Sequence, residues 1–218
     1  MSPEAIYHDL YVQARGALRQ ELTSHLRRGR SQRKPQYETK GRISNMVLIS
    51  ERPSEADDRA VPGHWEGDLL LGAFSRSQVG MLIERTTRFT LLFQLPEDRT
   101  APKVTAALMR TVKKLPEHLS RSLTWDQGKE LAQHVRFTVD SGIQVYFCDP
   151  AKPWQRGTAE NTNGLLRQYM PKGTDLSKLS EDDLDAIAAE LNERPRKTLG
   201  WDSPAEAYAR VAGVATTK

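Results

Sequence analysis

Two aspartates and one glutamate are the residues of this sequence that could bind a metal ion. The two aspartates lie in or at the end of apolar runs, where acidic residues are uncommon. Asp68 lies inside the apolar run of residues 64–72, and Asp126 ends a second such run, residues 122–126. A carboxylate left ionised and unpaired in a core strand is strongly destabilising, so such an acid is usually paired, metal-bound or neutralised. With Glu160 the two aspartates would supply three hard oxygen ligands, which suit Mg²⁺ or Mn²⁺ and not Zn²⁺. We therefore expect a divalent-metal site made by Asp68, Asp126 and Glu160.

Glu160 follows a short basic loop. This loop carries Lys152 and Arg156 together with the chain breakers Pro153 and Gly157. Basic side chains just ahead of a catalytic helix suit contacts with phosphate groups, although plain surface charge is the alternative interpretation. We expect Lys152 and Arg156 to contact DNA.

The loop leads into a predicted helix over residues 158–170, which Pro171 ends. On this helix Glu160, Asn163 and Arg167 occupy positions i, i+3 and i+7 and so share one polar face. A carboxylate, a carboxamide and a guanidinium in one stripe can hold a metal ion beside a phosphate. Another stripe of the helix is predicted to be buried and consists of Ala159, Thr162, Leu166 and Tyr169.

The elements that must position these groups follow from the hydrophobic pattern. Strands are expected at residues 65–73, 79–85, 89–95, 123–126 and 143–148, and helices at residues 102–115, 129–141, 158–170 and 181–192. The order β-β-β-α-β-α-β-α-α is typical of an α/β fold with a mixed five-stranded sheet flanked by helices. Asp68 would lie on the first strand and Asp126 on the fourth, and these strands would be neighbours.

The chain has 218 residues and a net charge of +4, which is distributed unevenly. Residues 15–42 contain nine basic and two acidic residues, a local charge of +7, which leaves −3 for the rest. This pattern indicates a polyanionic partner such as nucleic acid, or else a solvated linker. Residues 3–22 have the spacing of an amphipathic helix and residues 27–41 read as an extended arm. We expect a basic N-terminal region at residues 1–59, a main domain at residues 60–212 and a tail at residues 213–218.

The composition excludes several classes of protein. Apolar residues make up 38 % of the chain, and no run approaches the length of a membrane span. The single Cys148 excludes an internal disulfide framework and a thiolate zinc site. Without a signal-peptide pattern at the amino terminus, the expected location is cytoplasmic, with no membrane partner.

Four motifs, in order, resemble bacterial transposases of the insertion-sequence-thirty family. They are residues 63–68, 125–131, 150–169 and 192–207, and the likeness extends over residues 59–211. The 33 residues between Asp126 and Glu160 match the short spacing of integrase-type DDE enzymes. The resemblance implies a ribonuclease H-like catalytic core shared with retroviral integrases.

By this resemblance the chain is a DNA transposase that cuts and joins strands with two Mg²⁺ or Mn²⁺ ions. Asp68 would bridge the ions, and Asp126 and Glu160 would each hold one of them. Arg167 looks like the basic residue that contacts DNA near the cut end. The implied partners are double-stranded DNA, as element ends and target, and further copies of the chain. Members of the family carry helix-turn-helix regions ahead of the core, and residues 1–59 would hold only part of such a module.

Two other functions fit the same residues. A different metal-dependent ribonuclease H-like nuclease would share the three acids but would not join a 3′ end to target DNA. A shortened, non-catalytic regulator would occupy element ends without using the acids.

His64 could orient a metal-site group or make a structural hydrogen bond, and Glu66 could be a fourth acid or a solvated residue at the strand end. Trp154 could stack on a base or fill an edge of the core.

Overall fold

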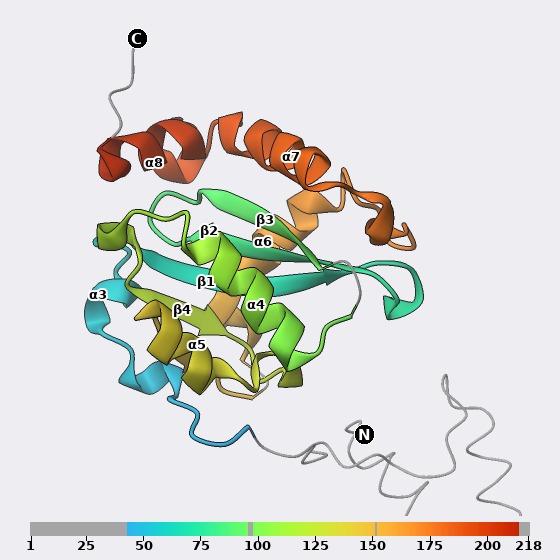
Figure 1. Cartoon of the computed structure of the whole chain (residues 1–218). Helices are drawn as coiled ribbons and strands as arrows, with labels where there is room; N and C mark the ends of the chain where they lie inside the picture. Colours follow the sequence, from blue (N-terminus) through green and yellow to red (C-terminus); the bar gives the residue numbers. More distant parts are fainter. Residues whose placement is uncertain (1–42, 96–97, 151, 214–218) are drawn as a thin grey trace, which may run out of the picture. The chain divides into compact units, whose positions relative to one another are not determined.

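The computed structural model describes residues 43–95, 98–150 and 152–213. The helix expected at residues 3–22, the arm at residues 27–41 and nearly all of the tail lie outside these ranges. The described chain forms a mixed sheet of five strands: β1 (His64–Leu71), β2 (Gln78–Glu84), β3 (Thr90–Leu95), β4 (Ser122–Trp125) and β5 (Gln144–Phe147). The strand order is β3-β2-β1-β4-β5 (Figure 1). β1 pairs antiparallel with β2 and parallel with β4, so the expected neighbouring placement of the first and fourth strands is confirmed.

Helices cover both faces of this sheet. On one face lie α4 (Ala101–Val112) and α5 (His134–Ser141), and on the other lie α6 (Gly157–Leu166) and α7 (Glu181–Glu193) (Figure 1). Of the α-helices in the described part of the chain, the other two are the short α3 (Ser54–Asp57) and α8 (Pro204–Ala212). This arrangement is the predicted ribonuclease H-like architecture.

Alternation along the strands divides the core into two layers. On β2, Leu82 joins the cluster under α4 and α5, while its neighbours Met81 and Ile83 join the cluster under α6 and α7. Successive side chains of a strand point to opposite faces, which explains this division. Every residue of β2 is buried because helices cover the sheet on both sides.

Local signals set the helix ends. Ser180 begins α7 with a capping box to Asp183, and Ser203 begins α8 in the same way with Glu206.

Two helices differ from their predicted bounds. The helix predicted over residues 158–170 ends at Leu166. Beyond it the amides of residues 168 and 169 bond to carbonyls three residues back, which tightens the chain ahead of Pro171. The helix predicted over residues 129–141 is interrupted, with a 3₁₀ turn at Lys129–Leu131 ahead of α5.

The compact unit begins at Ile43, ahead of the boundary expected near Ala60. Ile43 is buried in the core, and Leu48 forms an isolated parallel bridge with Phe147 at the edge of the sheet. Arg52 donates a hydrogen bond to Thr124 on β4 at 2.8 Å. Residues 43–59 therefore pack with the sheet and are not part of the basic arm. Residues 43–48 form a turn and this bridge, ahead of a 3₁₀ turn at Ile49–Glu51. Within the described ranges, no helix is long and apolar enough to span a membrane.

Candidate active site

Asp68 lies on β1, and Asp126 directly follows the neighbouring parallel strand β4, one residue beyond its end. The register pairs His64 with Ser122 and Glu66 with Thr124, and the same offset of 58 residues, continued past the last paired residues, would bring Asp68 level with Asp126. The backbone of β1 approaches the ring of Trp125 at Gly67, where an added Cβ would lie 2.1 Å from Trp125 Cζ3. Only glycine fits here, so Gly67 and Trp125 set how closely the two strands pack beside the aspartates.

A single guanidinium connects the two aspartates. Arg156 Nη1 lies 3.3 Å from Asp68 Oδ1, and Arg156 Nη2 lies 3.6 Å from Asp126 Oδ2. Arg156 also donates to the carbonyl oxygen of Gly67 at 3.1 Å. Burial acts to lower the pKa of Arg156, but the negative charges of Asp68 and Asp126 outweigh it, so the pKa is raised. This arginine therefore stays charged and partly balances two carboxylates.

The helix α6 reaches this pair through Asn163. Asn163 Nδ2 donates to Asp68 Oδ2 at 2.9 Å, and the other oxygen of Asp68 accepts the amide of Leu69 at 2.9 Å. The amide oxygen of Asn163 is buried and has no hydrogen-bond partner in the described structure. An amide oxygen without a partner, next to two carboxylates, is a hard ligand that a divalent cation would satisfy.

Glu160 lies one turn before Asn163 on α6, and its side chain is exposed. Among the described residues, no three acidic, histidine or cysteine side chains are arranged to hold a metal ion together. The structure thus brings Asp68 and Asp126 together around Arg156. Glu160 lies on the same face of α6 as Asn163, but its carboxylate makes no hydrogen bond or ion pair with Asp68, Asp126 or Arg156. The donors present, two carboxylates and an amide oxygen, fit a hard divalent cation in kind.

The other predicted DNA contacts have protein partners. Lys152 is exposed, and its ammonium lies 2.6 Å from Asp149. Arg167 donates to the carbonyl oxygens of Leu71 at 3.0 Å and Met170 at 3.2 Å, which ties the end of α6 to the end of β1.

Three residues left open by the sequence have distinct environments. His64 is buried, and its Nδ1 lies 2.7 Å from the hydroxyl oxygen of Ser122. The pKa of His64 is lowered, and burial is the largest cause. The interpretation of His64 as a residue that makes a structural hydrogen bond is therefore confirmed. Both interpretations of Glu66 were wrong. It is fully buried, pairs with Arg85 at 2.9 Å and accepts the amide of Ala159 at 3.0 Å. Trp154 is 69 % exposed, which excludes a role in the core.

Glu130 is an acid near the site that the sequence assigned only to the start of a helix. Its carboxylate packs against Gly128, whose amide donates to Asp126 Oδ1 at 2.9 Å. The pKa of Glu130 is raised, mainly by burial and further by the charge of Asp126. Its place four residues after Asp126 is the only sequence signal that could have pointed to it.

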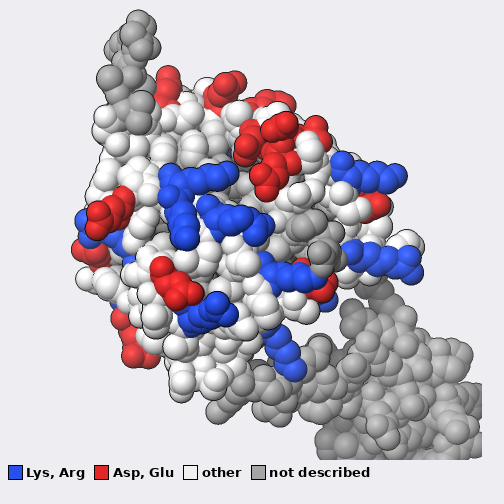
Figure 2. All heavy atoms as spheres, viewed as in Figure 1, with Lys and Arg blue, Asp and Glu red and all other residues white. Residues whose placement is uncertain are grey.

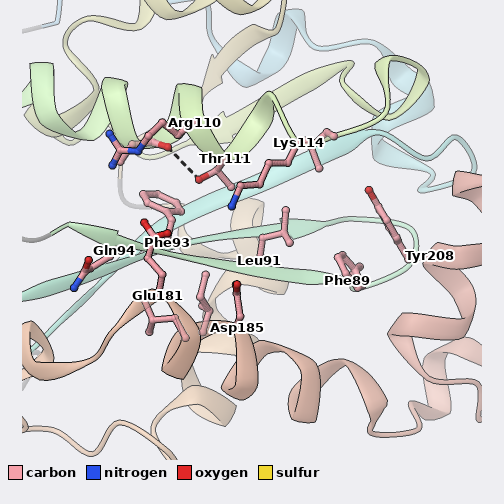
Figure 3. A pocket seen from close by; sticks show the side chains of 14 residues that line it. Phe89, Leu91, Phe93, Gln94, Arg110, Thr111, Lys114, Glu181, Asp185 and Tyr208 are labelled. Carbon is pink, nitrogen blue, oxygen red and sulfur yellow. Dashed lines mark hydrogen bonds between the residues drawn. The ribbon is translucent and has the colours of Figure 1, made fainter.

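A different hollow lies along the edge strand β3, away from the aspartates. It has a volume of about 400 Å³ and an apolar floor that includes Phe89, Leu91 and Phe93 (Figure 3). Arg110 and Lys114 border it on the α4 side, and Glu181 and Asp185 border it on the α7 side. Figure 2 shows the same division on the surface, with basic side chains gathered beside α4 and acidic ones over α7. None of the predicted catalytic residues lines it.

Comparisons with known proteins find relatives of this chain. Residues 58–153 match the family model of the integrase core domain. The chain is 50 % identical over 214 residues to the transposase for insertion sequence element IS1086 of Cupriavidus metallidurans, covering 97 % of this chain and 63 % of that protein. It is 47 % identical over 223 residues to transposase InsI for insertion sequence element IS30C of Escherichia coli K12, covering 100 % of this chain and 57 % of that protein. The chain thus spans 57–63 % of the length of these relatives.

Solved structures share the fold. The catalytic core domain of BIV integrase matches with a TM-score of 0.51 and 17 % identity, over 68 % of this chain and 95 % of that one. A chain of the simian T-cell lymphotropic virus intasome, in complex with PP2A regulatory subunit B56 gamma, matches with a TM-score of 0.56 and 16 % identity. That match covers 72 % of this chain and 59 % of the other. At these identities the likeness concerns the fold alone.

Proposed function

We propose, from the premise that this chain is a homologue of the IS30-family transposases, that it is a DDE transposase that cuts and joins DNA strands. Its substrates would be double-stranded DNA at the ends of an insertion element and at a target. The observation that carries the proposal is the pair Asp68 and Asp126, one on β1 and one directly after the neighbouring β4, bridged by Arg156. Two partly exposed carboxylates beside a basic loop suit phosphodiester chemistry.

The proposed roles follow from these positions. Asp68, Asp126 and Glu160 would hold the divalent metal that the chemistry needs. When bound, the ions would activate the attacking oxygen and stabilise the leaving oxygen of the phosphodiester. Asn163 holds Asp68 in orientation through its 2.9 Å hydrogen bond.

The basic groups would position the DNA. Arg156 is placed to move from the aspartates to a phosphate oxygen, because a guanidinium binds carboxylates and phosphates with the same fork geometry. Lys152, exposed on the same loop, would add a second phosphate contact. The exposed Trp154 would stack on an unpaired base near the cut. Arg167, which fixes the end of α6 to β1, would contact the DNA near the cleaved end.

We extend the proposal to the assembly. Like the transposases it resembles, the chain would act as a homo-oligomer across paired DNA ends, on the DNA of the bacterial cytoplasm. The basic residues 15–42 would add affinity for DNA without reading sequence.

The test uses a pre-cleaved duplex from an end of the DNA element that encodes this chain. Incubated with target plasmid and Mg²⁺ or Mn²⁺, the wild-type protein should join the 3′ end to the plasmid. Asp126→Asn should abolish cleavage and joining while leaving DNA affinity unchanged, because it removes a ligand charge and keeps the side-chain shape. Retained cleavage would remove Asp126 from the site. Cleavage without joining would indicate a nuclease, and an unchanged biological effect of Asp126→Asn would indicate a regulator that acts by occupancy.

A further inference from the structure

A second hollow lies on the opposite side of α6 from the aspartates. It has a volume of about 340 Å³, and α6 lines it with Thr158, Asn161, Thr162 and Leu165. These positions, at i, i+3, i+4 and i+7, share one helical face. At about 100° of rotation per residue, that face is opposite the one formed by Glu160, Asn163 and Arg167. The hollow is therefore separate from the site already described.

Three arginines from distant parts of the chain converge on this hollow. They are Arg59, Arg88 and Arg196, and no acidic residue among those that the structure describes lines it. Arg88 Nη1 donates to the hydroxyl of Thr158 at 2.6 Å, and Arg196 Nη2 donates to the carbonyl oxygen of Leu191 at 3.2 Å. Within the described ranges, none of the three arginines forms an ion pair. The hollow thus gathers positive charge that the protein leaves unbalanced.

The electrostatics of Arg88 reflect this imbalance. Burial lowers the pKa of Arg88 most, the charge of Arg59 lowers it further, and the charges of Glu66 and Glu84 raise it in part. Burial also lowers the pKa of Arg196, followed by the charge of Arg194. Like charges held together at a half-buried place repel each other, and a bound anion would relieve that repulsion.

The backbone supplies a second, independent observation. Arg59 and Arg88 both have left-handed conformations, with φ of 53° and 63°. Side chains other than glycine, asparagine and aspartate are uncommon there, and strain of this kind is concentrated at functional sites. Glycine would satisfy both turns without strain, so the turns alone do not explain an arginine at either place.

We propose that this hollow binds a backbone phosphate of the DNA substrate, through the guanidinium groups of Arg59, Arg88 and Arg196. This inference rests on the proposed function for the identity of the polyanion. Guanidinium groups match phosphate oxygens in pairs, and such contacts fix the register of a duplex without reading its sequence. The polar groups of Thr158 and Asn161 would complete the cradle.

The thickness of α6 sets where on the DNA this contact falls. The two faces of a helix with its side chains are about 10–12 Å apart, and each nucleotide of a strand advances about 3.4 Å along the duplex axis. The phosphate in the hollow would therefore lie about three nucleotides from the phosphate at the proposed metal site. A neutral methylphosphonate placed at that position should weaken binding more than one placed elsewhere in the duplex.

The direct test measures the affinity of the full-length protein for a fluorescein-labelled duplex by anisotropy over a series of salt concentrations. Arg88→Gly and Arg196→Ala should each weaken binding about tenfold at moderate salt. Each should also make the slope of log affinity against log salt shallower by about one. Arg88→Gly removes the side chain and relieves the left-handed backbone, so its melting temperature should stay near that of the wild type. Arg88→Lys, which keeps the charge, should retain most of the affinity.

The matched control is Arg136→Ala, which removes an exposed arginine from α5 whose partner is Asp140. It should leave both the affinity and the salt slope unchanged. Wild-type affinity and slope in both Arg88→Gly and Arg196→Ala would overturn the proposal. A change in oligomeric mass without DNA, with DNA affinity unaltered, would also overturn it, because the hollow would then hold an acidic segment of a second copy.

The two proposals fail separately. If the wild type neither cuts nor joins DNA while Arg88→Gly still weakens DNA binding, the proposed phosphate site is supported and the proposed transposase activity is wrong. If Asp126→Asn abolishes joining while Arg88→Gly binds DNA normally, the proposed activity is supported and the proposed phosphate site is wrong.

Discussion

The two faces of α6 carry opposite imbalances of charge. On one face, the single cation of Arg156 lies between the carboxylates of Asp68 and Asp126. On the other face, three arginines surround a hollow that no acid lines. An unbalanced charge at a partly buried place is costly, and an ion of opposite sign relieves it. The first face is therefore suited to a cation and the second to an anion, and a metal-dependent enzyme acting on DNA needs both.

A buried ion pair holds the helix between these regions. Glu66 accepts the amide of Ala159 in the first turn of α6 and pairs with Arg85, and neither side chain is exposed by more than 6 %. The backbone of α6 is thereby attached to the central strand β1. The placement of both faces relative to β1 depends on this anchor, and the anchor and each face can be tested separately.

Of the effects that separate the two faces of α6, the largest should be a loss of activity at Glu160 that is absent at the next residue. Glu160→Gln should lower the rate of cleavage about 10²–10³-fold at unchanged DNA affinity, as expected when one preorganised group is lost. Asn161→Ala, on the opposite face, should weaken DNA binding a few fold and leave the rate at saturating DNA unchanged. Both side chains are exposed, so neither change should affect folding. Equal losses of rate in the two variants would remove the distinction between the faces.

The next largest effect concerns the shared anchor. Glu66→Gln should lower the free energy of unfolding by about 3 kcal/mol, because it leaves the buried charge of Arg85 without its partner. Denaturant unfolding followed by circular dichroism measures this change. As a control, Glu190→Gln removes an exposed acid that pairs with Arg194 and should change stability by less than about 1 kcal/mol. A Glu66→Gln protein as stable as the wild type would show that the pair does not hold α6 in place.

A smaller effect should follow from removing the cation between the aspartates. Arg156→Gln should lower the free energy of unfolding by about 1–2 kcal/mol in the absence of divalent ions, because Asp68 and Asp126 then repel each other. Mn²⁺ should raise the melting temperature of this variant more than that of the wild type, since ligands that bind the folded state stabilise it. If Mn²⁺ stabilises neither protein, the aspartates do not form a cation site.

The sequence was sufficient for the parts of the fold and site that depend on local patterns. Alternating runs predicted all five strands, and the apolar run containing Asp68 placed it correctly beside the strand that Asp126 follows. The helical spacing of Glu160, Asn163 and Arg167 predicted a shared polar face, and the hydrogen bond from Asn163 to Asp68 agrees with it. Patterns of this kind arise from side-chain period, which neighbours in sequence determine.

The remaining features depend on contacts between distant segments. The sequence indicated Arg156 as a phosphate contact but gave no sign that it bridges two aspartates, since this requires the loop before α6 to fold over β1 and β4. The predictions for Glu66 were wrong because the alternation of side chains along a strand shows only that Glu66 shares a sheet face with Asp68. It does not show that Arg85 forms an ion pair with Glu66 on that face. The helix α8 was missed because it follows a turn-rich segment, although Ser203 and Glu206 form a capping box. The hollow lined by the three arginines could not be predicted from the sequence, because it joins residues as far apart as Arg59 and Arg196.

Titration of the full-length protein with Mn²⁺, followed by calorimetry, tests the central claim most directly, because it needs neither DNA nor turnover. The account predicts saturable binding to the wild type that Asp68→Asn and Asp126→Asn each weaken about 100-fold or more, as loss of a metal ligand would. Arg88→Gly, on the other face of α6, should bind Mn²⁺ as the wild type does. Mn²⁺ binding that is absent from the wild type, or unchanged in both aspartate variants, would contradict the claim that these carboxylates form the metal site.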